Sequence, residues 1–223
     1  MKRLVLLTCA AIYSIVLTGA TSGLHRDISF THISINDGLS QSTVRSACQD
    51  SRGQMWFATH DGLNRFDGYD FTVYRHRDDD STSIADNIIR KVYLDSKGGL
   101  WVGTEKGLSF YDRDKDSFRN FSTGGKTVTG IAEDSNGRFI VATGGSLRIF
   151  NSNTWNWEIS APPCQPETFG ATILYRDKED IWIGTDGEGL NRFNPKTHTF
   201  THYESTLKTK VVSIASYSQT ELA

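Results

Sequence analysis

A short motif recurs four times and constrains the fold of this chain more than any other feature. Each copy has a turn, a short apolar strand that ends in Gly-Thr or Ala-Thr, and a second turn. The closing threonines are Thr59, Thr104, Thr143 and Thr185, so the spacings are 45, 39 and 42 residues. A period near 42 residues with this content indicates β-propeller blades, each a four-stranded sheet that cannot bury its faces alone.

Aligning the copies predicts an all-β fold, a partial β-propeller of four four-stranded blades. Residues 211–223 predict an incomplete fifth blade, and residues 23–41 a lead-in to the first. Within that lead-in, Ile28–Ile33 matches the fourth strands of the later blades and predicts a lone N-terminal outer strand that could fasten a ring. The four full blades are expected at about residues 42–75, 88–121, 128–159 and 171–203, within an incomplete propeller over 42–223.

The blade count leaves sheet edges open. Closure is what removes edges from such an array. We therefore expect either that the natural protein is longer and this is its N-terminal piece, which we favour, or that a truncated chain pairs its edges with something else.

The first 22 residues read as a secretory signal peptide. Met1-Lys2-Arg3 is followed by the apolar run Leu4–Leu17 and by small residues suited to cleavage. The run is shorter than the 18 or so apolar residues of an uncleaved anchor. We expect a periplasmic or otherwise exported chain, in which Cys48 and Cys164 remain as isolated thiols rather than a disulfide framework.

An opening Asp37-Gly38-Leu39-Ser40 precedes repeats of Asp-x-x-Gly-x-x-Trp-x-Gly/Ala-Thr, then x-x-Gly-Leu, then a closing aromatic pair. The clearest copies include Trp56–Thr59, Asp61–Gly68 and Trp101–Thr104. This pattern, over about residues 28–214, resembles the two-component regulator propeller repeat.

The resemblance implies a bacterial sensor, the N-terminal periplasmic part of a hybrid sensor histidine kinase. Such sensors commonly respond to glycan fragments through a membrane helix and a kinase. The chain has no such segments beyond its leader, so the resemblance implies contact with a membrane only through absent C-terminal parts. The partners expected are a glycan-derived ligand and either the remaining blades or another propeller.

The loops between second and third strands are the expected binding surface. They lie on the same face as the crossings between blades, such as residues 75–87, and their sequences differ while the scaffold repeats. Polar residues in them are candidates for a sugar ligand, although solvated turns without a ligand are the alternative. The candidates are His60, Asp61, Glu105, Lys106, Asp186 and Glu188.

Other polar residues have structural explanations. The repeated Asp50, Asp95, Asp134 and Asp177 are turn formers, since aspartate accepts hydrogen bonds from the backbone two residues on. His198 and His202 lie about 13 Å apart on a strand, too far to share one metal. We expect no catalytic set, no metal site and no cofactor. The formal net charge of −2 disfavours nucleic-acid binding.

Three functional hypotheses remain at this point. The chain is an exported sensory module that binds without transforming its ligand, an exported propeller enzyme acting on glycans, or a protein-interaction module. Catalysis requires convergent acid–base groups or a metal set, and we find none in the sequence, so we favour the sensor over an enzyme.

Overall fold

The computed structural model describes residues 30–158, 170–203 and 209–215. The chain divides into two compact units, Met1–His32 and Ile33–Ala223, and the account below concerns the second. The predicted signal peptide and Cys164 lie outside the described residues. No helix among the described residues is long and apolar enough to cross a membrane.

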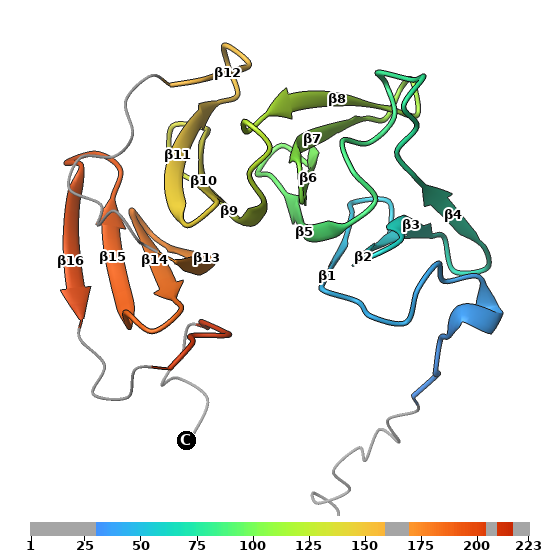
Figure 1. Ribbon diagram of the computed structural model, residues 1–223, viewed down its shortest axis with the longest axis horizontal. Helices are drawn as coiled ribbons and strands as arrows, with labels where there is room; N and C mark the ends of the chain where they lie inside the picture. Colours follow the sequence, from blue (N-terminus) through green and yellow to red (C-terminus); the bar gives the residue numbers. More distant parts are fainter. Residues whose placement is uncertain (1–29, 159–169, 204–208, 216–223) are drawn as a thin grey trace, which may run out of the picture. The chain divides into compact units, whose positions relative to one another are not determined.

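Within the described residues, four antiparallel four-stranded sheets follow one another in sequence order (Figure 1). Blade one contains β1 (Ser46–Gln49), β2 (Met55–Thr59), β3 (Gly62–Phe66) and β4 (Phe71–Tyr74). Blade two contains β5 (Ile89–Leu94), β6 (Leu100–Thr104), β7 (Gly107–Asp112) and β8 (Ser117–Ser122). Blade three contains β9 (Val128–Glu133), β10 (Arg138–Thr143), β11 (Ser146–Asn151) and β12 (Asn156–Trp157). Blade four contains β13 (Ala171–Asp177), β14 (Asp180–Thr185), β15 (Leu190–Asn194) and β16 (Thr199–Tyr203).

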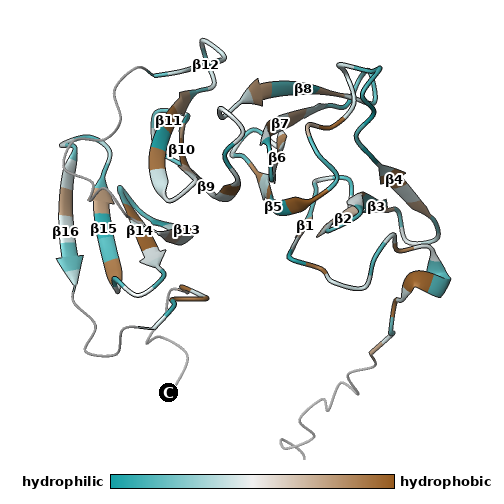
Figure 2. Cartoon of the chain, in the orientation of Figure 1, coloured by the Kyte–Doolittle hydropathy of each residue, from teal (hydrophilic) through white to brown (hydrophobic). Residues whose placement is uncertain are grey.

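The first strands of successive blades contact one another, β1 with β5, β5 with β9 and β9 with β13. Each sheet then buries its apolar residues against the next sheet. Trp56 of blade one lies in one core with Val102 of blade two, and Trp101 lies in another with Phe139 of blade three. Figure 2 shows hydrophobic residues interspersed with hydrophilic ones along the strands of all four sheets. The partial β-propeller is therefore confirmed.

A small residue in each second strand allows the next blade to come close. A Cβ placed on Gly103 would lie 2.6 Å from a methyl group of Val128, at the start of blade three. Gly184 in blade four has the same relation to Val211, again at 2.6 Å. At Gly103 and Gly184 a glycine is thus required by the contact with the next blade, whereas blades one and three carry Ala58 and Ala142 at this position.

The start of the predicted fifth blade is in place, although no ladder strand forms over the described residues 209–215. Lys210 makes an isolated bridge to Asp186, and the Val211 amide donates to the Thr185 carbonyl at 2.9 Å. The Thr172 hydroxyl donates to the Val211 carbonyl at 2.7 Å, as the Thr129 hydroxyl does to the Ala171 carbonyl at 2.9 Å. Val211 therefore occupies the place that Ala171 takes at the start of blade four.

The predicted N-terminal outer strand is wrong in its described part. Residues 30–33 have an irregular backbone and form no strand. A short 3₁₀ helix, η1 (Ile35–Asp37), follows it. The lead-in docks on blade one through Ser40, whose amide donates to the Asn64 side-chain oxygen at 2.8 Å. Residues 28 and 29 lie outside the described residues.

The repeated aspartates are turn formers in three of the four blades. Asp50 accepts the backbone amides of Arg52 and Gln54, and Asp95 accepts those of Lys97 and Gly99. Asp134 does the same with two turn amides. The turn at Asp177 is one residue shorter than that at Asp95, so this position departs from the shared design.

Cys48 provides a test of the packing around β1. Burial, helped by the negative charge of Asp50, raises the pKa of its thiol to about 11. We expect iodoacetamide at pH 8 to alkylate Cys48 about 100-fold more slowly in the folded chain than in urea, because only the thiolate reacts. Peptide mapping by mass spectrometry measures both rates. Equal rates would show that β1 does not pack against blade two as described.

Candidate functional site

The loops between second and third strands do share a face with the crossings between blades. The Gly62 amide donates to the Asn87 carbonyl at 2.7 Å, and the Glu105 amide to the Ile88 carbonyl at 3.0 Å. The Gly144 amide bonds in the same way to Thr127 at 3.0 Å. The expected arrangement of loops and crossings is therefore present.

In blades one and two, the candidate side chains already form ion pairs or hydrogen bonds with neighbouring residues of this chain. Arg75 holds Asp61 through two bonds of 3.1 and 2.9 Å. Arg90 and the Thr127 hydroxyl both hold Glu105. Two further contacts complete the set, Arg45 with His60 at 3.0 Å and Lys106 with Asp86 at 3.0 Å.

These contacts fix the charge states of the loop residues. The hydrogen bond from Arg75 lowers the pKa of Asp61, and those from Thr127 and then Arg90 lower the pKa of Glu105. The bond to Asp86 raises the pKa of Lys106. All three groups therefore stay charged at neutral pH, and they contact the crossings and first strands rather than one another.

The candidates in blade four are more open. Asp186 faces Lys210 at 3.7 Å, and both side chains are more than half exposed. Glu188 is exposed. The structure thus places the six candidates on one face but gives them separate neighbours, so they do not form one cluster.

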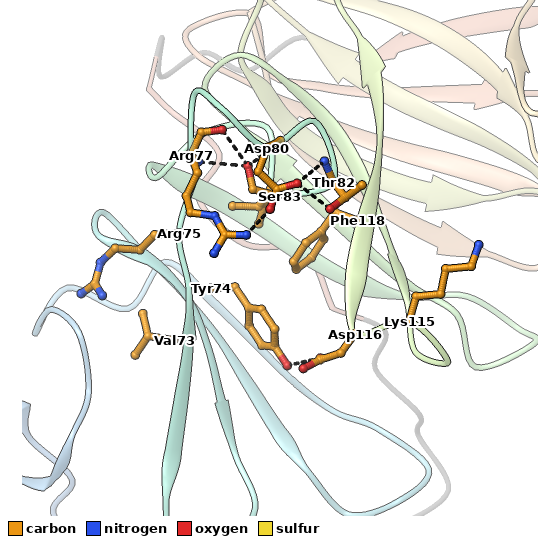
Figure 3. Close-up of a pocket in the computed structure, with 11 residues that line it drawn as sticks. Val73, Tyr74, Arg75, Arg77, Asp80, Thr82, Ser83, Lys115, Asp116 and Phe118 are labelled. Atoms are coloured by element: carbon orange, nitrogen blue, oxygen red, sulfur yellow. Dashed lines mark hydrogen bonds and ion pairs between the residues drawn. The ribbon is translucent and has the colours of Figure 1, made fainter.

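A cavity of about 350 Å³ lies instead at the seam between blades one and two (Figure 3). The end of β4, the crossing after it and the start of β8 enclose it. In Figure 3, Tyr74 and Phe118 lie between the arginines of the crossing and Lys115–Asp116. The rings of Tyr74 and Phe118 meet edge to face at 5.4 Å. The cavity thus has an aromatic wall and a charged rim.

The crossing that covers this cavity is held by its own polar groups. Arg77 pairs with Asp80, whose carboxylate also accepts the Thr82 hydroxyl at 2.6 Å. The Ser83 hydroxyl donates to the Asp80 carbonyl at 2.7 Å and accepts the Arg77 amide at 2.9 Å. Hydrogen bonds from Thr82 and then Arg77 lower the pKa of Asp80 to about 2. The crossing is therefore preorganised around a permanent charge.

A shared hydroxyl–carboxylate contact closes the other side of the cavity. The hydroxyls of Tyr74 and Tyr111 both donate to Asp116, at 2.6 and 2.5 Å. Burial raises the pKa of Tyr74 and Tyr111, and the bonds to Asp116 add to it. Burial by itself would raise the pKa of Asp116, but the hydrogen bonds from the two tyrosines outweigh burial, so the pKa of Asp116 is lowered. Both phenols therefore remain donors and Asp116 remains an acceptor.

Asp116 reaches this position through a turn that the sequence analysis did not single out. Asp112 accepts the amides of Asp114 and Lys115, and Asp116 then takes a φ of 49°, in the left-handed region. Trp155 takes the same conformation in blade three, after Asn151. The sequence signal for this turn was an Asp or Asn four residues before the residue with positive φ, as Asp112 is before Asp116 and Asn151 before Trp155. The crossing at 75–87 was anticipated as a binding surface, but these turns were not.

The donors and acceptors around the cavity suit a polar ligand with one apolar face. Guanidinium, ammonium, hydroxyl and carboxylate groups surround the aromatic wall, and the charged lining residues carry three positive and two negative charges. Within the described part of the chain, no group of three or more His, Cys, Asp or Glu side chains is placed to hold a metal ion.

Two segments of the chain, residues 38–61 and 83–106, match the family model of the two-component regulator propeller. The resemblance drawn from the repeats is therefore confirmed in these segments. A stretch of 57 residues, 26% of the chain, is 56% identical to Histidine kinase P4 of Formosa agariphila. The match spans only 4% of the length of that curated relative.

Solved structures share the fold. The extracellular domain of BT3049 from B. thetaiotaomicron, described as a hybrid two-component system, superposes with a TM-score of 0.66 at 24% identity. The match covers 78% of this chain and 26% of that one. A virginiamycin B lyase from Staphylococcus aureus superposes with a TM-score of 0.60 at 11% identity, covering 74% of this chain and 56% of that one. Both likenesses show the propeller fold alone.

Proposed function

We propose that this chain is the ligand-binding part of an extracytoplasmic sensor in a two-component signalling protein, and that it responds to a glycan-derived saccharide. The observation that carries the proposal is the family match over blades one and two, the blades whose seam forms the cavity. The chain binds and releases its ligand unchanged, and the kinase output belongs to other domains. Export through residues 1–22 would place the site outside the cytoplasm.

The chemistry of the cavity supports a saccharide. An aromatic ring offers its face to the C–H groups of a sugar, while charged and hydroxyl groups at the rim bond the sugar hydroxyls. Tyr74 and Phe118 supply the aromatic wall, and Arg75, Arg77 and Asp80 supply the rim. A volume of about 350 Å³ is at the lower end for small-molecule sites and suits one or two sugar rings.

The test is calorimetric titration of the purified chain with neutral and uronic-acid-containing disaccharides. We expect saturable binding of at least one of them, and a rise in Tm at saturating concentration because the ligand binds only the folded state. We expect Arg75→Ala to weaken that binding about 10-fold, equivalent to about 1.4 kcal/mol.

The matched control is Lys196→Ala in blade four. Lys196 and Glu179 form an ion pair of 2.9 Å with both side chains about half exposed, as Arg75 and Asp61 do. Both substitutions should change the free energy of unfolding by only about 0–1 kcal/mol. Equal affinity of the two variants for the disaccharide would show that the binding site is not at this seam. If no disaccharide binds, the proposal that the ligand is a saccharide is wrong.

A further inference from the structure

Two arginines lie on the aromatic rings between blades two and three. The guanidinium carbon of Arg148 in β11 lies 4.1 Å from the ring centroid of Trp157, and that of Arg119 in β8 lies 4.6 Å from the ring centroid of Trp155. Both tryptophans pack against the core that blades two and three share. A guanidinium stacked on a ring keeps the N–H donors at its edge for other partners. We call these four side chains the arginine–tryptophan surface.

No carboxylate pairs with either arginine in the described part of the chain. Between blades one and two, Arg65 also lies over aromatic rings, but it pairs with Asp116 at 3.5 Å. Trp155 stands at the position of Asp116 in the repeat, and both residues have a positive φ. The neighbouring acid, Glu158, pairs instead with Arg138 at 3.7 Å. The two guanidiniums therefore lack the negative charge that is present at the other seam.

The crossing before blade three does not cover this surface. Before blade two, the Thr82 carbonyl of a longer crossing accepts the Phe118 amide at 2.7 Å, so that crossing lies along β8. Only residues 123–127 separate β8 from β9, and none of their described hydrogen bonds reaches β11 or β12. Arg148 and Trp157 are accordingly only partly buried.

Donors without acceptors gather at this point of the structure. Burial lowers the pKa of Arg148, and no described acid opposes that shift. The indole N–H of Trp157, over which Arg148 lies, is buried and has no acceptor. A partly buried cation without a partner costs free energy. A carboxylate satisfies a guanidinium well, because its two oxygens match two parallel N–H donors.

We propose that the arginine–tryptophan surface binds the carboxylate of a uronic-acid unit in an acidic saccharide. The saccharide class rests on the proposed function, whereas the need for a negative charge rests on this surface alone. Arg148 donates to the carboxylate and Arg119 adds a second positive charge. The exposed side chains of Asn153, Thr154 and Asn156, in and beside the adjoining turn, bond to the sugar hydroxyls.

The experiment is calorimetric titration of the purified full chain with trisaccharides of galacturonate, glucuronate and mannuronate, and with their uncharged methyl esters. We expect at least one uronate to bind about 10-fold more tightly than its ester, the gain typical of one charged hydrogen-bonded contact. Arg148→Met keeps an apolar stem on Trp157 and removes the charge. It should abolish most of that 10-fold difference and leave the affinity for the ester unchanged.

Arg52→Met is the matched control. Arg52 is exposed in the turn after β1, so its substitution changes the net charge equally at a distant place. We expect this variant to bind the uronate as the natural chain does, and near-UV circular dichroism to show that both variants fold. Triglutamate, which carries carboxylates without a sugar, should bind at least 10-fold more weakly than the uronate.

Three results would each overturn the proposal. They are uronates that bind no better than their esters, equal losses of affinity in Arg148→Met and Arg52→Met, and equal affinity for triglutamate and the uronate. Arg75→Ala separates this surface from the cavity between blades one and two. If Arg75→Ala weakens binding of the esters, the proposed function stands even where the uronates show no preference for Arg148.

Discussion

Trp101→Ala is expected to lower the free energy of unfolding by about 3–5 kcal/mol, the usual cost of removing a buried aromatic side chain. Trp101 is 1% exposed. Its ring centroid lies 4.9 Å from that of Phe110 in its own blade and 4.6 Å from that of Phe139 in blade three. Its indole N–H also donates to Asp95 at 2.9 Å. The substitution therefore leaves a cavity at a seam and an acceptor without its donor. Urea denaturation followed by circular dichroism measures the change.

Trp182→Ala is the matched control for this prediction. Trp182 occupies the same position of the repeat in blade four but is only partly buried, and its ring lies 5.5 Å from that of Tyr203. We expect a loss less than half as large, because less apolar surface returns to water. Equal losses would mean that the face of blade four is as well covered as the seam between blades two and three.

Asp50→Ala is expected to destabilise the chain by about 3–5 kcal/mol, because it breaks a buried ion pair by removing one partner. The Asp50 side chain is fully buried and accepts Arg113 of the next blade at 2.8 Å. It also accepts the Trp56 indole N–H at 3.1 Å. Asp95→Ala is the control: Asp95 makes the same turn and tryptophan bonds, and its loss should be smaller since no arginine is stranded.

The same carboxylate predicts a pH dependence. Burial disfavours its charge, but hydrogen bonds from Trp56, Arg113 and the turn amides outweigh burial and lower the pKa of Asp50. A group with a depressed folded pKa stabilises the fold above its unfolded pKa of about 3.9, and that stability is lost as the pH falls through the folded value. The difference in Tm between wild type and Asp50→Ala should therefore shrink below about pH 4. A difference that stays constant down to pH 2 would contradict this account.

The sequence predicted the repeat architecture well because blade formation is largely local. The turns at Asp50, Asp95 and Asp134 close between residues at most four apart, and the strands that they join pair in simple hairpins. Such contacts leave a periodic signal that can be aligned within one chain. The residues at 30–33 show the limit, since a single apolar pattern was not enough to establish a strand without its neighbour.

The candidate site was harder to predict than the fold. The loops share a face with the crossings as expected, yet the charged loop residues are paired with nearby arginines, Asp61 with Arg75 and Glu105 with Arg90, from positions 14 and 15 residues away. Asp116 lines the cavity from a turn whose sequence resembles an ordinary solvated acidic run. It accepts a hydrogen bond from Tyr74, which lies 42 residues earlier in the chain.

The sequence by itself determined the blades and their turns, because these follow from local hydrogen bonding and from spacing. Only the tertiary structure decided which side chains meet across a seam. Asp50 finds Arg113 at a separation of 63 residues, and Arg65 finds Tyr111 at 46. These contacts depend on how one sheet is placed on the next. That placement is decided by side-chain packing over the whole interface, and the periodicity within a blade does not encode it.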